Sequence, residues 1–337
     1  SPPTMALPPP PSPSPPRSAA SSTASAPSTA ALDYASLDAA ACRSLIGGPP
    51  INGPANRSSR MVWWSRLPRT GSGTFSDAIA KAMDDSWQKH SEHDASVSFR
   101  WDVGPTICAK AANWHQPWFM EAHIPHPEPY HQPACAALKN GNHRPFVFGE
   151  MREPAKWCWS WIAFWWRHRT HPHAPLWAKR YYAPLRSAPD FNIFAQRHAS
   201  EACELQMTRW FCGAACAPRA SEMVPANISQ ARRREMRARA VCAVKYVYAA
   251  VGELEDAIGL LRRVQAREPS LFDKPVAMPK QDAHVRSSTT PPKPLTERVI
   301  AEVTADDADF YAATRRFMGV RMRALAAEMG EAQKIET

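Results

Sequence analysis

The stretch MVWWSRLPRTGSGTFSDAIAKAM (61–83) decides the fold that this sequence predicts. Its first part, MVWWSRLP (61–68), is a short apolar and aromatic run typical of a buried strand. RTGSGT (69–74) is a turn of glycines and small hydroxyl residues. FSDAIAKAM (75–83) predicts a helix with one apolar face, formed by Phe75, Ile79 and Ala82 or Met83. A strand, a small-residue loop and a helix in this order form a common phosphate-binding arrangement.

A second unit of the same kind follows. RPFVFGEM (144–151) predicts a strand, and REP (152–154) turns into a helix with Pro154 near its first position. WCWSWIAFWW (157–166) is apolar all round, so this helix is expected to be buried.

A third pair of elements is predicted further along the chain. AVKYVYAAV (243–251) is typical of an inner strand, and GELEDAIGLLRRVQ (252–265) of a helix. The inner side of that helix is expected at Leu254, Ile258, Leu261 and Val264 or Gln265. Strands that alternate with helices predict an α/β domain with a mainly parallel central sheet flanked by helices.

Two other segments predict helices. QARRREMRARA (230–240) is expected to form a helix with a solvated basic face. Thr304 and Asp307 resemble a capping box, which would start a final amphipathic helix with Phe310, Phe317 and Leu325 on its apolar side.

Composition limits the classes of protein. The chain has 337 residues and 44% apolar residues, enough for a sizeable core, which excludes wholesale disorder. It contains no run of about 18 uncharged apolar residues, so no bilayer-spanning helix is expected. The 41 Lys+Arg against 31 Asp+Glu give a net charge of +10, which suits an acidic partner.

The N-terminal region is dominated by proline, serine and alanine. PPPPSPSPP (8–16) favours an extended polyproline II chain. We interpret residues 1–56 as a disordered stem and residues 57–330 as the folded domain, and an untrimmed disordered terminus is the alternative. A membrane anchor, if the stem carries one, would precede Ser1.

The cysteines and the glycosylation acceptor patterns give information on the cellular compartment of the protein. Eight cysteines without a CxxC pair argue against a zinc ribbon, and Cys212 and Cys216 are either a disulfide or two buried thiols. Asn56-Arg-Ser and Asn227-Ile-Ser match glycosylation acceptors, as in a secretory glycoprotein.

Two segments carry the chemistry. The first, LPRTGSGTF (67–75), offers backbone N–H groups and the hydroxyls of Thr70, Ser72 and Thr74 to a tetrahedral anion, although an ordinary Gly-Ser turn has the same composition. It is not a Walker A loop, because no lysine follows its second glycine. In the second, MREPAKWCWS (151–160), Arg152 and Ser160 lie eight residues apart and could grip one phosphate. Alone, Arg152 is equally a solvated charge at a strand end.

Five segments, in order over roughly residues 60–327, resemble the uronyl and heparan sulfate 2-O-sulfotransferase family, which are Golgi carbohydrate sulfotransferases. They are PRTGSGTF (68–75), REPAKWCWS (152–160), LQMTRWFCG (205–213), VGELEDAIGLLRR (251–263) and AHVRSSTTPPKPLT (283–296). The resemblance implies a P-loop NTPase-like sulfotransferase fold. It also implies transfer of a sulfuryl group from 3′-phosphoadenosine 5′-phosphosulfate to the 2-OH of a uronic acid in a glycosaminoglycan.

The same resemblance assigns roles to residues. The 5′-phosphosulfate would be held by the first loop, that is by Arg69, Thr70, Gly71, Ser72, Gly73 and Thr74. Arg152 and Ser160 would clamp the 3′-phosphate, and Arg286 with Ser287 would close over the donor, with no metal required. Where this chain has Arg69, the family has a lysine, and that lysine steadies the bridging oxygen as the sulfate leaves. A sulfotransferase-like binding protein with impaired catalysis is therefore an alternative, and a P-loop-type kinase is another.

The acceptor hydroxyl requires a base, and histidine suits this task near neutral pH. The family's base falls in the stretch EAHIPHPEPYH (121–131), where His123 is the best match and His126 and His131 are rivals. These three histidines with Cys135 could instead be zinc ligands, although their spacing is poor for a metal.

The basic stretch RHRTHPHAPLWAKRYYAPLR (167–186) suits a polyanionic acceptor. We expect Lys179, Arg180 and Arg186, with His126, to contact an acidic polysaccharide, and a solvated basic face is the alternative. A nucleic-acid partner is disfavoured by the paired phosphate segments. The expected protein is a type II membrane protein with its domain in the Golgi lumen, and family members of this kind form homo-oligomers.

Overall fold

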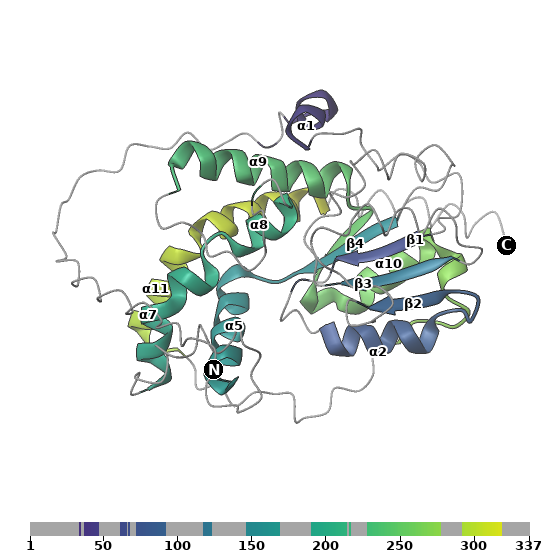
Figure 1. The fold of residues 1–337 in the computed structure, drawn as a ribbon, viewed down its shortest axis with the longest axis horizontal. Helices are drawn as coiled ribbons and strands as arrows, with labels where there is room; N and C mark the ends of the chain where they lie inside the picture. Colours follow the sequence, from purple (N-terminus) through teal and green to yellow (C-terminus); the bar gives the residue numbers. More distant parts are fainter. Residues whose placement is uncertain are drawn as a thin grey trace, which may run out of the picture. The chain divides into compact units, whose positions relative to one another are not determined.

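The described part of the chain contains a five-stranded parallel sheet (Figure 1). Its strands are β1 (Met61–Ser65), β2 (Gln88–Ser91), β3 (Trp118–Ala122), β4 (Phe146–Met151) and β5 (Ala250–Glu253). They lie in the order β2-β3-β1-β4-β5, and every neighbouring pair is parallel. The expected α/β architecture with a parallel sheet is confirmed.

The computed structural model describes residues 34, 37–46, 61–65, 67, 72–91, 117–122, 146–168, 190–213, 216, 228–277 and 292–318. All of them belong to the second of two units into which the chain divides, Asp33–Thr337. No helix among these residues is long and apolar enough to cross a bilayer.

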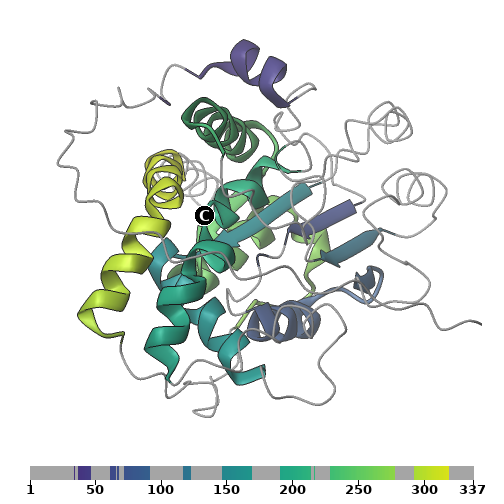
Figure 2. The same ribbon diagram turned by 60° about the vertical axis from the view of Figure 1, so that its left-hand side comes forward.

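Helices cover both faces of the sheet because its strands are apolar on both sides. Trp64, Phe146 and Phe148 pack with α2 (Ser72–Ala82) and α10 (Ala257–Arg267) on one face. Trp63, Val147 and Met151 face the other core. That second core is built from α5 (Pro154–His168), α7 (Phe191–Cys203), α8 (Gln206–Cys212), α9 (Gln230–Tyr246), α11 (Pro294–Val303) and the helical residues 305–318. The helices α5, α7 and α11 pack against one another (Figure 2).

The first two strand–helix units form as the sequence predicts, but the second helix is not buried all round, because Trp159, Trp161, Phe164 and Trp166 are only half-buried. β1 occupies residues 61–65, but α2 begins at Ser72 and so takes in the second half of the predicted turn. Pro154 is the first residue of α5. The carboxylate of Glu153 accepts hydrogen bonds from the amides of Ala155 (3.0 Å) and Lys156 (2.9 Å), which stabilises the start of this helix.

The predicted strand over residues 243–251 is wrong in its first half. α9 continues to Tyr246, and β5 begins only at Ala250. The side chains from Ala240 to Val244 are all buried, so tertiary packing outweighs the strand preference of this β-branched and aromatic run. After β5, a short turn of 3₁₀-helix, η4 (Leu254–Asp256), precedes α10.

The inner side predicted for α10 is correct only in part. Leu261 and Val264 are buried as expected, together with Ala257 and Leu260. Leu254 and Ile258 are only half-buried. The helix starts five residues later than predicted, because β5 and η4 occupy residues 250–256.

The predicted capping box is also wrong. Residues 305–318 are helical, and Phe310 is buried as expected, whereas Leu325 lies outside the described residues. The hydroxyl of Thr304 donates to the Ile300 carbonyl (2.8 Å) instead of capping. The carboxylate of Asp307 accepts from the amides of Met207 (3.0 Å) and Thr208 (2.8 Å), so it caps α8.

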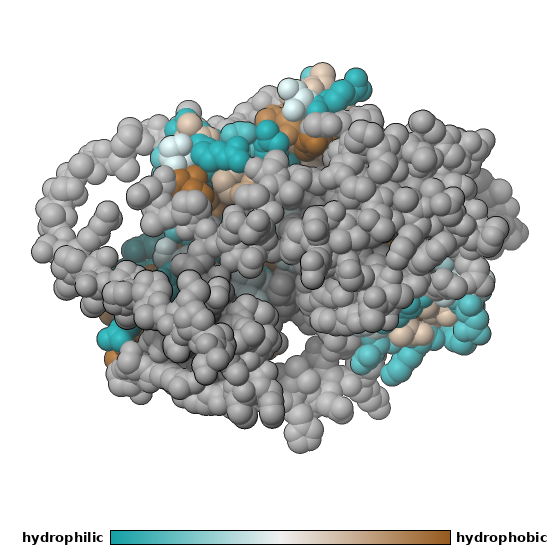
Figure 3. Space-filling view, viewed as in Figure 1, coloured by the Kyte–Doolittle hydropathy of each residue, from teal (hydrophilic) through white to brown (hydrophobic). Residues whose placement is uncertain are grey.

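The basic run of α9 is not simply a solvated face. Arg234 is exposed, and the visible surface of α9 is mainly hydrophilic (Figure 3). Arg233 and Arg237 are largely buried, however, and both pair with Asp306. Arg233 also pairs with Glu204. This network joins α9 to residue 204 and to the helical residues 305–318.

Three disulfides join the six cysteines of the described segments: Cys42–Cys242, Cys158–Cys203 and Cys212–Cys216. Cys212 and Cys216, which the sequence leaves as either a disulfide or two buried thiols, therefore form a disulfide. Cys42 lies on α1 (Ala39–Ile46), within the segment that we interpret as a disordered stem. Residues 39–46 depart from that expectation, because they are helical and bonded to α9.

Candidate anion-binding site

At the carboxyl edge of the sheet, the connections from β1 and from β4 lead in opposite directions across the sheet. β1 leads through α2 to β2 on one side, and β4 leads to β5 on the other. Ser65, the last residue of β1, pairs in register with Gly149 of β4 and with Ala122, the last residue of β3. In open α/β sheets, ligands bind outside the carboxyl ends of the strands at such a point.

The segments singled out from the sequence follow these neighbouring strands. Residues 66–71 connect β1 to α2, and Arg152 directly follows β4. Position 123 is the next in the chain after Ala122, the end of β3. The chain path therefore leads all three segments to the carboxyl ends of adjacent strands. From Ser72 onward the backbone is helical, so Ser72, Gly73 and Thr74 form the first turn of α2, where N–H groups have no partner within the helix.

A buried cluster of polar side chains holds the end of β1. The Ser65 hydroxyl accepts hydrogen bonds from the Tyr248 hydroxyl (2.9 Å) and from the Trp210 indole N–H (3.2 Å). Ser65 and Tyr248 are fully buried, and Trp210 is nearly so. Residues from α8 and from the segment before β5 thus meet at the point where the chain leaves the sheet.

Glu150 contributes a fully buried carboxylate on the opposite face of the sheet from this cluster. It lies on β4, and its Oε2 accepts from the indole Nε1 of Trp64 on β1. Burial raises the pKa of the Tyr248 hydroxyl well above its ordinary value, and the Glu150 charge adds to this effect. Tyr248 therefore stays protonated and acts as a donor to Ser65.

Arg152 stands at the end of β4 with its charge only loosely paired. Its side chain is 26% exposed, and its Nε lies 3.9 Å from Oε1 of Glu255 on η4. That Nε is buried and makes no hydrogen bond within the described part of the chain. Since Glu255 is half exposed, this ion pair is weak, and the guanidinium remains suited to bind an anion.

Ser160 lies on α5, half-buried and six residues after the start of that helix. This places it about 9 Å along the helix axis from Pro154. Arg152 and Ser160 thus belong to one strand–helix unit, as the sequence predicts, and the clamp itself stays a prediction.

Most other predicted site residues lie outside the described residues. They are Arg69, Thr70, Gly71, His123, His126, His131, Cys135, Lys179, Arg180, Arg186, Arg286 and Ser287. The alternative zinc site falls on four of these. In the segments that the structure does describe, no three potential metal ligands lie together.

Sequence reasoning missed Ser65, Glu150, Trp210 and Tyr248. One sign was available, because an acidic residue inside the apolar strand FVFGEM (146–151) is an exception that demands a partner. Trp210 and Tyr248 could not be found in this way, since they lie 145 and 183 residues from Ser65.

Comparison of the chain with models of protein families and with curated proteins gives no match. The class that the structure itself defines is an α/β protein with a parallel sheet.

Proposed function

We propose that this protein is a carbohydrate sulfotransferase with a P-loop NTPase-like fold. It would move a sulfuryl group from 3′-phosphoadenosine 5′-phosphosulfate to a glycan hydroxyl, in the first instance the 2-OH of a uronic acid. One observation carries the proposal: the expected 5′-phosphosulfate loop, the expected 3′-phosphate arginine and the expected base follow β1, β4 and β3, which are neighbours. This is the arrangement that one donor and one acceptor would require.

The reaction follows from the roles that the resemblance gives these residues. The acceptor oxygen attacks sulfur in line, the bond between sulfur and the bridging phosphate oxygen breaks, and His123 takes the hydroxyl proton. Cationic groups stabilise the leaving 3′-phosphoadenosine 5′-phosphate, namely Arg69 at its 5′ end and Arg152 at its 3′-phosphate. Ser160 adds a hydroxyl to the second site, and Arg286 with Ser287 closes over the donor.

The three disulfides support an oxidising compartment, since such bonds are rare in reducing ones. The proposed location is the Golgi lumen, where an acidic polysaccharide is the acceptor. Lys179, Arg180, Arg186 and His126 would contact that polyanion.

Nucleotide binding is the first test. Titration calorimetry with 3′-phosphoadenosine 5′-phosphate should show binding by the unaltered protein and at least tenfold weaker binding by Arg152→Ala, because a charge-assisted contact is lost. Arg298→Ala is the matched control, since Arg298 is an exposed arginine on α11. No heat with the unaltered protein, or equal affinities for the two variants, would contradict the proposal.

Sulfate transfer is the second test. Labelled sulfate should pass to desulfated heparin or dermatan, and His123→Ala should abolish the transfer while nucleotide binding persists. Unchanged transfer in this variant would move the base to another residue.

The second candidate is a sulfotransferase-like binding protein with impaired catalysis, which the arginine at position 69 favours. Arginine keeps the positive charge but is bulkier than lysine and never gives up a proton. Arg69→Lys should raise a weak transfer rate strongly if catalysis is impaired. Little change would show that Arg69 serves adequately.

A further inference from the structure

We propose that Ser65, Tyr248 and Trp210 form a positioning cluster that fixes the carboxyl end of β1 and thereby the anion-binding loop that follows it. This inference rests on the proposed function, because it names the residues that hold the donor site in shape. The three side chains are buried and are not expected to touch the nucleotide.

The cluster joins separate parts of the fold at one oxygen atom. The Ser65 Oγ accepts two hydrogen bonds, from Tyr248 at 2.9 Å and from Trp210 at 3.2 Å. Gly149 makes room for this arrangement: a Cβ there would lie 3.1 Å from the Tyr248 ring and 3.2 Å from the Ser65 carbonyl oxygen. Ser65 is the last residue of β1, so its backbone sets the point from which the chain leaves the sheet toward the proposed phosphosulfate-binding residues.

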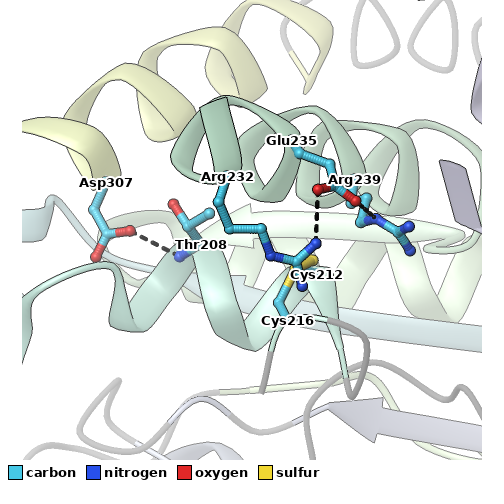
Figure 4. The surroundings of a disulfide bond; sticks show 7 residues. All are labelled: Thr208, Cys212, Cys216, Arg232, Glu235, Arg239 and Asp307. Carbon is cyan, nitrogen blue, oxygen red and sulfur yellow. Dashed lines mark hydrogen bonds and ion pairs between the residues drawn. A yellow bond between two sulfur atoms is a disulfide. The ribbon is translucent and has the colours of Figure 1, made fainter. Parts of the chain in front are cut away.

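Trp210 can serve as a fixed point because α8 is held near both ends (Figure 4). At its start, Asp307 accepts from the amides of Met207 and Thr208. At its end, Cys212 is bonded to Cys216. The indole of Trp210 therefore points at Ser65 from a helix that is fixed by a carboxylate and a disulfide.

Tyr248 is held by its own contacts with α8 and α9. Its ring packs 5.1 Å from the ring of Phe211 on α8, and its amide donates to the Ala243 carbonyl at the end of α9 (3.0 Å). Because its hydroxyl stays protonated, it is a constant donor to Ser65. The cluster thus sets the position of β1 relative to α8 and α9.

The test removes single hydrogen-bonding groups and leaves the packing intact. Tyr248→Phe deletes only the hydroxyl, and Tyr246→Phe is the matched control, since Tyr246 is a half-buried tyrosine two residues earlier. Ser65→Ala removes the shared acceptor and is the second variant. Each protein is examined for its Tm, its Kd for 3′-phosphoadenosine 5′-phosphate, the KM and kcat of sulfate transfer, and amide hydrogen exchange in β1.

Tyr248→Phe and Ser65→Ala are expected to weaken nucleotide binding about tenfold and to raise the donor KM more than they lower kcat, which a merely structural role would not do. Tyr246→Phe should bind like the unaltered protein. A lower Tm with unchanged Kd and KM would overturn the inference.

Failure of the proposed function gives a different result. If the unaltered protein binds no nucleotide, the proposed function fails, and hydrogen exchange alone decides the positioning role. The amides of Met61–Ser65 should then exchange faster in Tyr248→Phe than in Tyr246→Phe, and equal rates would refute the cluster's role.

Discussion

Removing the Cys42–Cys242 disulfide should destabilise the protein more than removing either of the other two described disulfides. Cross-linking stabilises mainly by restricting the unfolded chain, and the effect grows with the length of the closed loop. The bridge spans 200 residues, which corresponds to about 5 kcal/mol in the loop-entropy model. The same model gives about 4 kcal/mol for Cys158–Cys203, 45 residues apart, and about 2 kcal/mol for Cys212–Cys216, 4 residues apart.

The assay compares three double variants, each with both cysteines of one pair changed to alanine. Alanine is preferred to serine because Cys42, Cys242, Cys158 and Cys203 are completely buried, and a buried hydroxyl would add its own cost. Denaturant unfolding without reductant, followed by circular dichroism, should give losses in the order of the loop lengths. Each kcal/mol should lower the Tm by about 2–4 °C. If Cys42→Ala/Cys242→Ala loses no more free energy of unfolding than Cys212→Ala/Cys216→Ala, the bond to α1 adds no stability beyond that of the shortest loop, and the loop-length argument is refuted.

Three further predictions concern single residues. Burial raises the pKa of Asp307 from 3.8 to about 6, although the amides that donate to it act in the opposite direction. The protonated carboxyl therefore stabilises the folded state fully below pH 3.8, and this stabilisation is lost as the pH rises through about 6. Urea unfolding from pH 4 to pH 7 should show the free energy of unfolding of the unaltered protein falling with pH, and this fall should be smaller in Asp307→Asn. An equal fall in both proteins would disprove the role of Asp307. Arg233→Gln should lower the free energy of unfolding by about 2 kcal/mol, because the largely buried carboxylate of Glu204 loses its guanidinium partner and Asp306 keeps only Arg237. Arg234→Gln, exposed on the same helix, should change it by less than about 0.5 kcal/mol, and equal losses would contradict the burial argument. Gly252→Ala would place a Cβ 2.7 Å from that of Leu260 and should cost about 1–3 kcal/mol in thermal or urea unfolding, whereas an unaffected variant would show that α10 can shift.

Local patterns predicted the strand–loop–helix units well. An apolar run, a small-residue turn and a helical period lie within about 20 residues around β1, so no distant part of the chain is needed to recognise them. Pro154 marked the start of α5 for the same reason, since its missing N–H is tolerated at the first helical position.

The rest depended on contacts between distant residues. The end of α9 reads as a strand until its packing against α8 is known, because Val244, Tyr246 and Val247 favour strands locally. Asp307 resembles a cap for its own helix, yet its carboxylate is used by α8, about 100 residues earlier. The candidate site was predictable in part, because Arg152 and Ser160 belong to one strand–helix unit, whereas the cluster around Ser65 forms only once the sheet and α8 have come together.

The Cys42–Cys242 bridge has a consequence for how the protein responds to proteolysis. A single peptide-bond cleavage anywhere between these two cysteines leaves both fragments covalently joined, since the bond spans 200 positions of the chain. A nicked molecule would therefore migrate at full mass in a non-reducing gel and separate into two pieces only after thiol treatment. Integrity of the backbone between residues 42 and 242 can thus be judged on a gel only under reducing conditions.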